Sequence, residues 1–251
     1  MTILVTGGGR GIGRAIALAF AEPGDTVAIA ARTRLQLEET ADAIRARGGR
    51  AIVLAMDITD ENAVERCFSE LRSASLGLDI LVNNAGIGGG QPIHATDTAA
   101  WHQVVDTNVW GTFLVTRQAI SLLADGGRII NMSSVLGRFG VPGYTAYCAS
   151  KHAIIGFTRA LALELTDRGI TVNAICPGWV DTAMAAEGMR GGAAAMDITF
   201  EQFRDKAIGR VPIGRIIQPE EVANLVKFLA SPQASAITGQ AYNICGGQTM
   251  D

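Results

Sequence analysis

Apolar runs and amphipathic segments alternate along almost the whole chain. Short apolar runs, which predict buried strands, are residues 3–5, 27–31, 51–55, 79–82, 128–132, 170–175 and 240–245. Segments with apolar positions at helical spacing, which predict helices, are residues 12–20, 35–47, 61–75, 98–124, 147–165, 200–208 and 219–229. Strands that alternate with helices in this way form a parallel sheet with helices on both faces. The pattern therefore predicts an α/β protein built as a three-layer sandwich.

Composition narrows the class of protein further. The 251 residues are 48% hydrophobic, carry a formal net charge of −3 and contain no linker-like stretch, so we expect a single domain over residues 1–251. The sequence contains no stripe of basic residues that would indicate binding to nucleic acid. No apolar run is long enough to cross a bilayer. The four cysteines lack C-x-x-C spacing and the three histidines lack metal-ligand spacing. We therefore expect a cytoplasmic protein with reduced thiols, no signal peptide, no metal and a small-molecule ligand.

A glycine-rich turn joins the first predicted strand to the first predicted helix. Gly7, Gly11 and Gly13 lie in this turn, directly after the apolar run 3–5. Glycines at such a junction let backbone N–H groups approach a pyrophosphate at the N-terminus of the helix. The context of strand, turn and helix favours nucleotide binding over a turn that is merely tight.

Arginines replace the acid that usually follows the second strand of a dinucleotide-binding fold. An acidic side chain at that place binds the ribose hydroxyls of NAD, but residues 27–37 contain none. Arg32 and Arg34 stand there instead, and Arg10 lies within the glycine turn. Guanidinium groups suit a 2′-phosphate, so we predict NADP(H) rather than NAD(H), with Arg32 the first candidate and Arg10 the second. The alternative is that these arginines are solvated surface residues.

A tyrosine, a lysine and a serine are the candidate catalytic groups. Tyr147 and Lys151 are four residues apart in a helical segment, so they lie on one face. A nearby positive charge favours the phenolate and lowers the pKa of a tyrosine from about 10. Ser134 follows the strand 128–132, where its hydroxyl could hold a substrate oxygen beside the phenol. These groups suit proton transfer to and from an alcohol or carbonyl oxygen. A lysine that merely covers an aromatic ring is the alternative.

Two polar residues are each compatible with two roles. Asp57 follows the third strand and can accept a hydrogen bond from an adenine amino group, or it can cap the helix that begins near Glu61. Asn108 interrupts the segment 98–124, with Gly111 shortly after it. A kink there would expose a backbone carbonyl that could hold water, but a buried asparagine is more often satisfied locally and structural.

Residues 183–212 form a candidate lid. This region is rich in Ala, Gly and Met, and helical spacing is clear only around residues 200–208. Long connections of this kind often close over a site. Its apolar residues suggest an apolar pocket, although simple packing is the alternative; they are Met184, Met189, Met196 and Phe200.

Taken together, the motifs and their order resemble the short-chain dehydrogenase/reductase family. The matching segments are Thr6-Gly-x-x-x-Gly-x-Gly13, Asn83-Asn-Ala-Gly86, Asn108, Ser134, Tyr147-x-x-x-Lys151 and Pro177-Gly178. The resemblance implies a single Rossmann-type domain with a seven-stranded parallel sheet. It also implies a homotetramer, or else a homodimer, whose interface is formed partly by the two long predicted helices, residues 98–124 and 147–165.

The resemblance assigns a role to each motif residue. It implies that Tyr147 is the general acid in reduction and the base in oxidation, and that Lys151 lowers the pKa of this tyrosine and binds the nicotinamide ribose. Ser134 would orient the substrate oxygen, and Asn108 would hold a water in a proton relay to Lys151. The remaining implied cofactor contacts are Gly7, Gly9, Arg10, Gly11, Ile12, Gly13, Arg32, Asp57, Ile58, Asn84, Ala85, Gly86, Pro177, Gly178, Val180 and Thr182.

Within the family, segments near the C-terminus resemble 3-oxoacyl-(acyl carrier protein) reductases and aromatic-polyketide ketoreductases. These segments are residues 170–178, 211–215, 219–222 and 243–247, together with the glycine run 88–90. The expected function is interconversion of a ketone and a secondary alcohol, with a 3-oxoacyl thioester or a cyclic or aromatic ketone as substrate. The long lid favours a bulkier ketone. The alternatives are an NAD(H)-dependent alcohol dehydrogenase, an isomerase or dehydratase on the same scaffold, or a non-catalytic nucleotide-binding regulator.

Overall fold

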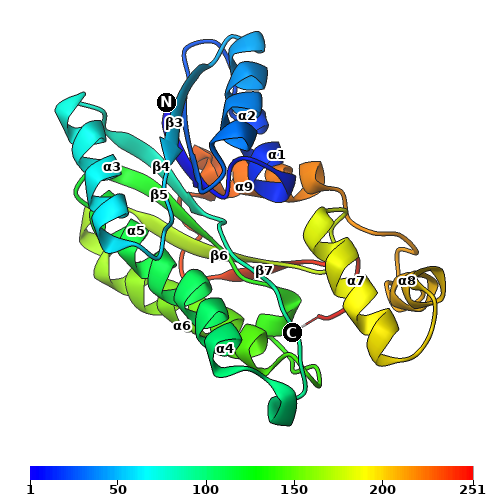
Figure 1. Cartoon of the computed structure of the whole chain (residues 1–251). Helices are drawn as coiled ribbons and strands as arrows, with labels where there is room; N and C mark the ends of the chain where they lie inside the picture. The colour runs from blue at the N-terminus through cyan, green and yellow to red at the C-terminus, as the bar shows by residue number, and fades with distance from the viewer. Residues whose placement is uncertain (251) are drawn as a thin grey trace.

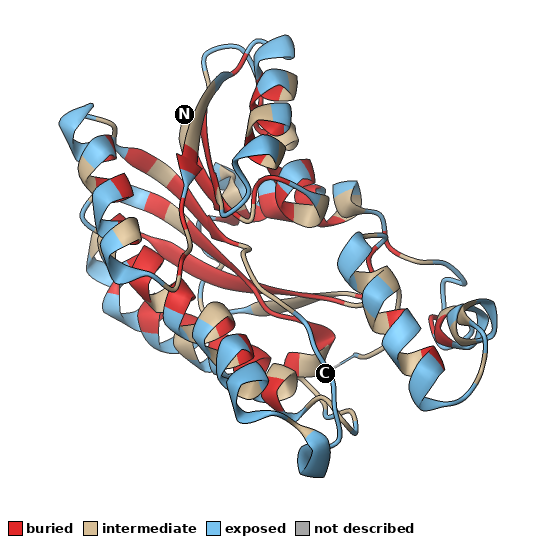
Figure 2. Cartoon of the chain, in the orientation of Figure 1, coloured by how far each residue is buried: buried red, intermediate tan, exposed pale blue. Residues whose placement is uncertain are grey.

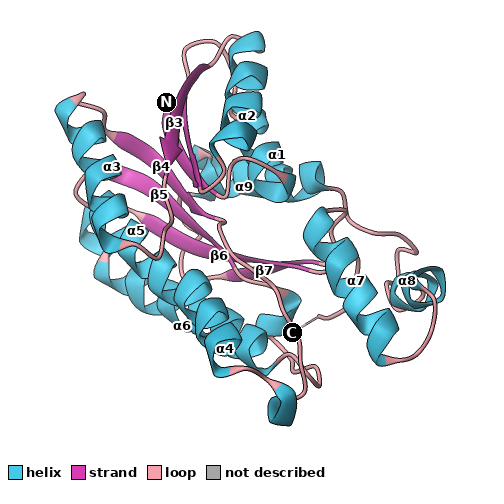
Figure 3. Ribbon diagram, viewed as in Figure 1, coloured by secondary structure: helices cyan, strands magenta, loops and turns pink. Residues whose placement is uncertain are grey.

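A seven-stranded parallel sheet runs through the centre of the protein (Figures 1 and 3). The computed structural model describes residues 1–250. The strand order is β3-β2-β1-β4-β5-β6-β7, and every pair is parallel. The strands are β1 (Thr2–Thr6), β2 (Thr26–Ala31), β3 (Arg50–Ala55), β4 (Leu78–Asn83), β5 (Leu123–Met132), β6 (Thr171–Pro177) and β7 (Ala241–Ile244). This is the α/β three-layer fold that the sequence pattern predicts.

Helices cover both faces of the sheet, and two more lie beyond its carboxyl edge (Figure 1). The helices are α1 (Gly11–Ala19), α2 (Arg34–Ala46), α3 (Glu61–Ser73), α4 (Thr98–Val105), α5 (Gly111–Ala119), α6 (Thr145–Glu164), α7 (Ala183–Ala195), α8 (Phe200–Ile208) and α9 (Pro219–Ala230). Helices α1, α2 and α9 share one hydrophobic core with the sheet, and α3, α5 and α6 share the other. Within residues 1–250, none of the helices combines the length and apolarity needed to cross a membrane.

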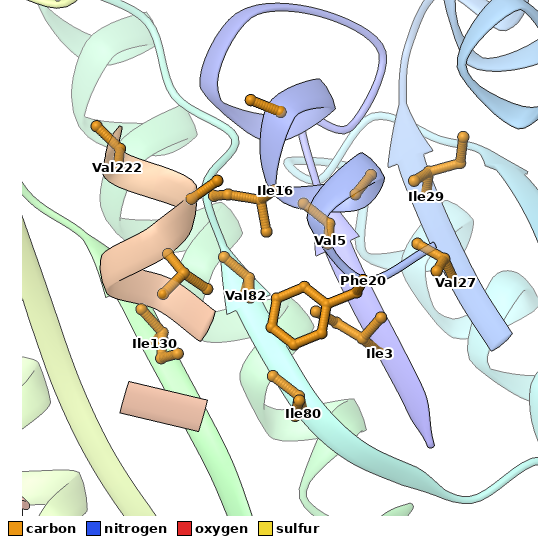
Figure 4. Packing of buried hydrophobic residues seen from close by; sticks show 14 of the residues in the cluster. Ile3, Val5, Ile16, Phe20, Val27, Ile29, Ile80, Val82, Ile130 and Val222 are labelled. Atoms are coloured by element: carbon orange, nitrogen blue, oxygen red, sulfur yellow. The ribbon is translucent and has the colours of Figure 1, made fainter. Parts of the chain in front are cut away.

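Alternation along each strand divides its side chains between the two cores. In β1, Ile3 and Val5 pack towards α1 and α9, whereas Leu4 packs into the core shared with α3 and α5. Figure 4 shows the first of these cores, with Phe20, which directly follows α1, among the strand side chains. All three strand residues are fully buried, and burying such a side chain contributes about 2 kcal/mol. Burial on both faces explains why these strands are continuously apolar, as the red strands in Figure 2 illustrate.

Two expectations about the helices are corrected by the structure. The predicted helix 98–124 ends at Ala119, and β5 begins at Leu123 because this segment pairs with β4, where the Leu78 N–H donates to the Leu122 carbonyl over 2.8 Å. The apolar residues 122–124 are compatible with a helix or with a strand, and pairing with β4 makes Leu123 and Ala124 part of the sheet. The predicted lid contains a helix that the pattern missed, α7, before the correctly predicted α8. The interruption near residue 108 is a π-helical turn, Asp106–Trp110.

Candidate active site

The residues predicted to form the site gather at the carboxyl edge of the sheet. Parallel strands end at one edge, and ligands of such sheets bind there. Each of six strands is followed by a predicted site residue: Gly7 after β1, Arg32 after β2, Asp57 after β3, Asn84 after β4, Ser134 after β5 and Gly178 after β6. The chain thus brings together residues that are up to 171 positions apart.

The glycine turn is held closely against the end of β4. Gly7 and Gly11 have φ values of +67° and +53°, which glycine adopts without strain. Asn84 Nδ2 donates to the Thr6 carbonyl over 2.9 Å, and Thr6 Oγ1 accepts from the Asn84 and Ala85 N–H groups, each over 3.0 Å. A Cβ on Gly13 would lie 2.5 Å from Asn84 Nδ2 and would also collide with the Gly7 carbonyl. The N-terminus of α1 can therefore approach the turn only because residue 13 is glycine.

The turn after β6 lies beside the glycine turn. A Cβ on Gly11 would be 3.3 Å from the Thr182 side chain, so these two predicted cofactor contacts are neighbours. Thr182 begins α7 by accepting from the Ala185 N–H over 3.2 Å. Buried Val180 bridges to Ile217, and the Gly178 N–H donates to the Ile244 carbonyl over 3.1 Å. Both ends of this turn are therefore fixed to the sheet and its neighbours. Pro177 is the last, buried residue of β6.

The structure resolves the two roles that the sequence left open for Asp57. Asp60, not Asp57, caps α3, and its side chain accepts from the Ala63 N–H over 3.1 Å. Asp57 Oδ1 accepts from Thr59 N–H and Oγ1 over 2.9 and 2.8 Å. Its other oxygen, Oδ2, lies 3.9 Å from the guanidinium of Arg32. Capping is thus the wrong role for Asp57, which leaves this carboxylate beside Arg32 at the edge of the sheet.

The other predicted cofactor contacts differ in what they can offer. Arg10, the N-cap of α1, is exposed, and the Arg32 side chain is 61% exposed. Gly9 is buried against α2, and Ile12 is half-buried in the first turn of α1. The side chain of Ile58 is buried against Gly111 of α5, so only its backbone can face a nucleotide.

The three candidate catalytic side chains meet at the N-terminal end of α6. The Tyr147 phenol lies close enough to Ser134 for that residue to affect its pKa, and the Ser134 hydroxyl accepts from the Leu136 N–H over 3.1 Å. Lys151 is 5% exposed, and its Nζ donates to the Met132 carbonyl over 2.9 Å and lies 5.6 Å from the centre of the Tyr147 ring. The loop after β4 closes this group, since a Cβ on Gly86 would be 3.5 Å from Lys151 Nζ.

The titration of this pair differs from the sequence-based expectation. Burial raises the pKa of Tyr147 to about 12, and the hydrogen bond with Ser134 only partly opposes this. Burial also lowers the pKa of Lys151 to about 8. The expected lowering of the tyrosine pKa by lysine is therefore not found in the protein alone, because the cost of desolvating the phenolate exceeds the attraction of an ammonium directed towards Met132.

Asn108 is buried in the π-helical turn and satisfied on every side. Its Oδ1 accepts from the Ile87 N–H over 2.9 Å, and its Nδ2 donates to the Ile87 carbonyl and to Ser150 Oγ, each over 3.0 Å. Its backbone carbonyl accepts from Thr112 Oγ1 over 2.9 Å. The side chain therefore joins the β4 loop to α6, which agrees with the expectation that a buried asparagine has a structural role. A water on the carbonyl stays a prediction.

Sequence reasoning missed Thr6 and Ser150 as parts of the site. Thr6 fixes the start of the Asn84 loop, and Ser150 joins Asn108 to the Tyr147 carbonyl, to which it donates over 2.8 Å. A signal was available for Ser150, because it is a polar residue on the buried face of a helix that also carries Tyr147 and Lys151. Only the tertiary structure shows which partner it has.

The predicted lid is a pair of packed helices beyond the carboxyl edge of the sheet (Figure 1). A Cβ on Gly192 of α7 would lie within 3.0 Å of the Phe203 ring of α8. The Trp179 ring packs beside Gly188, where a Cβ would be 3.6 Å away. Met184 is 44% exposed and lies over Gly88 of the β4 loop. Helix α7 therefore reaches from the β6 turn to the β4 loop, across the carboxyl edge of the sheet.

Comparison with known proteins agrees with this geometry. A family model described as enoyl-(acyl carrier protein) reductase matches residues 7–249. The chain is 43% identical over 249 residues to a monensin polyketide synthase putative ketoacyl reductase of Streptomyces virginiae (97% of this chain, 95% of the relative), and 38% identical over 247 residues to a 3-oxoacyl-(acyl-carrier-protein) reductase of Aquifex aeolicus (97% and 95%).

Solved structures give the same result. A variant of an actinorhodin polyketide ketoreductase, crystallised with NADPH, superimposes with a TM-score of 0.92 and 39% identity, covering 98% of this chain and 96% of that one. The match therefore extends over the entire sheet and over α7 and α8 rather than over the nucleotide-binding half alone. This chain belongs to the short-chain dehydrogenase/reductase family.

Proposed function

We propose that this protein is an NADP(H)-dependent oxidoreductase that interconverts a ketone and a secondary alcohol, with Tyr147 as the general acid and base. One observation carries the proposal: Tyr147 and Ser134 lie close together beside the buried ammonium of Lys151, at the same edge of the sheet as the glycine turn. The proposed proton donor, the hydroxyl that would bind the substrate oxygen and the proposed nucleotide-binding turn therefore lie at the same edge of the sheet.

The residues around the cradle fit a dinucleotide. Gly7 and Gly11 adopt positive φ, and Gly13 leaves no room for a side chain, so backbone N–H groups at the start of α1 are available to a pyrophosphate. Arg32 and Arg10 are exposed near this end and are suited to an additional phosphate. The nicotinamide ring supplies or accepts a hydride when it is bound. The structurally similar ketoreductase crystallised with NADPH supports NADP(H) over NAD(H).

Each catalytic group has a task that its surroundings favour. With a pKa near 12, the Tyr147 phenol stays protonated at neutral pH, so it is ready to donate a proton to a carbonyl oxygen. The Ser134 hydroxyl would hold that oxygen in place. Lys151 would bind ribose hydroxyls and bring its charge towards the phenol. Reduction uses the protonated phenol, whereas oxidation requires the phenol to be ionised first.

The substrate proposal rests on the relatives. Two of them are named as ketoacyl or 3-oxoacyl reductases, so we propose a 3-oxoacyl thioester or a polyketide-type cyclic or aromatic ketone. Exposed Met184 and the apolar lid suit an apolar ketone. A homotetramer remains a prediction from the family resemblance, and a cytoplasmic location remains a prediction from the spacing of the cysteines.

The test is steady-state kinetics with NADPH and NADH over acyl thioesters, cyclic ketones and aromatic ketones. Tyr147→Phe should lower kcat by about 10²- to 10⁴-fold, the usual contribution of a general acid, while the Kd for NADPH stays close to that of the parent protein. Tyr242→Phe, on β7, is the matched control and should leave both values unchanged. Turnover that survives in Tyr147→Phe, or equal use of the two nucleotides, would contradict the proposal.

A further inference from the structure

We propose that Ser150 is a positioning residue, whose hydroxyl links Asn108 to the backbone of Tyr147 and so holds the first turn of α6 in register with the β4 loop. The proposal rests on the proposed function, because it concerns the placement of the phenol. It adds a residue to the site that the motif residues do not include.

The direction of every hydrogen bond in this link is determined. The Ile87 N–H can only donate, so Asn108 must present Oδ1 to it, and Nδ2 then faces the Ile87 carbonyl and Ser150 Oγ. Because Ser150 Oγ accepts from Asn108, its single proton is free for the Tyr147 carbonyl, to which it donates over 2.8 Å. The donor and the acceptor of each hydrogen bond between the β4 loop and α6 are therefore fixed.

The first turn of α6 has no side-chain cap. Its N-cap is Tyr144, whose side chain makes no capping hydrogen bond, although the first N–H groups of a helix have no partners within it. Tyr147 is the third residue of this helix, so its position depends on how this first turn is held. Ser150 is 1% exposed and Asn108 is 1% exposed. A buried, uncharged set of hydrogen bonds such as this one is rigid, because water cannot compete for the bonds.

The same helix offers a matched control. Thr158 Oγ1 accepts from Asn131 Nδ2 over 2.9 Å and donates to the Ile154 carbonyl over 2.8 Å, and Thr158 is fully buried. Its bonding thus copies that of Ser150, but it lies eleven residues beyond Tyr147, or about 16 Å along the helix. A variant at Thr158 loses the same kind of link, farther from the phenol.

The experiment compares Ser150→Ala with Thr158→Val in the full-length protein. We expect both to lower stability, whereas only Ser150→Ala lowers kcat, by roughly tenfold to a hundredfold, since a misplacement of about 1 Å at a reacting centre costs up to about 10²-fold. The Kd for NADPH should stay near the parent value in both variants. Equal kcat in Ser150→Ala and the parent, or an equal loss in Thr158→Val, would overturn the proposal.

A double-mutant cycle tests whether Ser150 acts through Asn108. On an Asn108→Ala background, Ser150→Ala should cost little further activity, because the link is already broken; fully multiplicative losses would contradict the inference. Hydrogen exchange provides a readout that does not need turnover. The N–H groups of residues 145–151 should exchange faster in Ser150→Ala but not in Thr158→Val. If the parent protein reduces no ketone, the proposed function fails, while the exchange result still decides the positioning role.

Discussion

Gly13→Ala tests the geometry of the nucleotide cradle most directly. The added Cβ would lie 2.5 Å from Asn84 Nδ2 and 2.7 Å from the Gly7 carbonyl carbon, whereas unstrained contacts of this kind are about 3.5 Å long. One partner is backbone and the other is held by its bond to the Thr6 carbonyl, so neither can rotate away. The N-terminus of α1 must therefore move by about 1 Å. Overpacking of this kind costs about 1–3 kcal/mol.

The same displacement moves the N–H groups that would bind the pyrophosphate. We expect the free energy of unfolding to fall by about 1–3 kcal/mol and the Kd for NADPH to rise by about tenfold to a hundredfold, since 1.4 kcal/mol is a factor of ten. Urea unfolding and fluorescence titration measure the two. Gly156→Ala, at an open and exposed position of α6, should instead raise stability slightly. Unchanged stability together with unchanged affinity in Gly13→Ala would refute this account of the turn.

Two further predictions concern the buried lysine and the lid. Because burial lowers the pKa of Lys151 from 10.5 to about 8, this side chain binds more protons in the unfolded chain than in the folded protein between these values, and its contribution to the stability of the nucleotide-free protein should rise with pH over this range by up to about 3 kcal/mol. Urea unfolding should show the stability of the parent rising over this range relative to that of Lys151→Met; parallel curves would exclude it. Gly192→Ala should displace the Phe203 ring and raise the KM for ketones with little change in NADPH affinity. The neighbouring Gly191, where a Cβ meets nothing within 4 Å, should tolerate alanine. Equal KM values for the two variants would contradict the proposed lid contact.

Local patterns predicted the strands well because both faces of the sheet are buried. In β2, for example, Val27 to Ala30 are all apolar and buried, so the sequence of this strand is an uninterrupted apolar run. Patterns were less reliable where one sequence suits two structures. Residues 122–124 are apolar and read as helix, but pairing with β4 makes Leu123 and Ala124 the start of β5. Helix α7 was missed because three glycines weaken its helical signal, and packing on Phe203 and Trp179 supports it instead.

The sequence by itself determined the fold class, because this follows from the alternation of strands and helices. It also predicted the edge of the sheet at which the candidate site lies and the residues proposed to form it, from motifs such as Tyr147 and Lys151. The tertiary structure decided what those residues touch. It assigned the capping of α3 to Asp60 rather than Asp57, and it joined Asn108 to Ser150 across two helices. It also showed that burial, rather than the neighbouring charge, controls the pKa of Tyr147. Hydrogen-bond partners and desolvation depend on segments that are distant in the chain, and no local pattern contains that information.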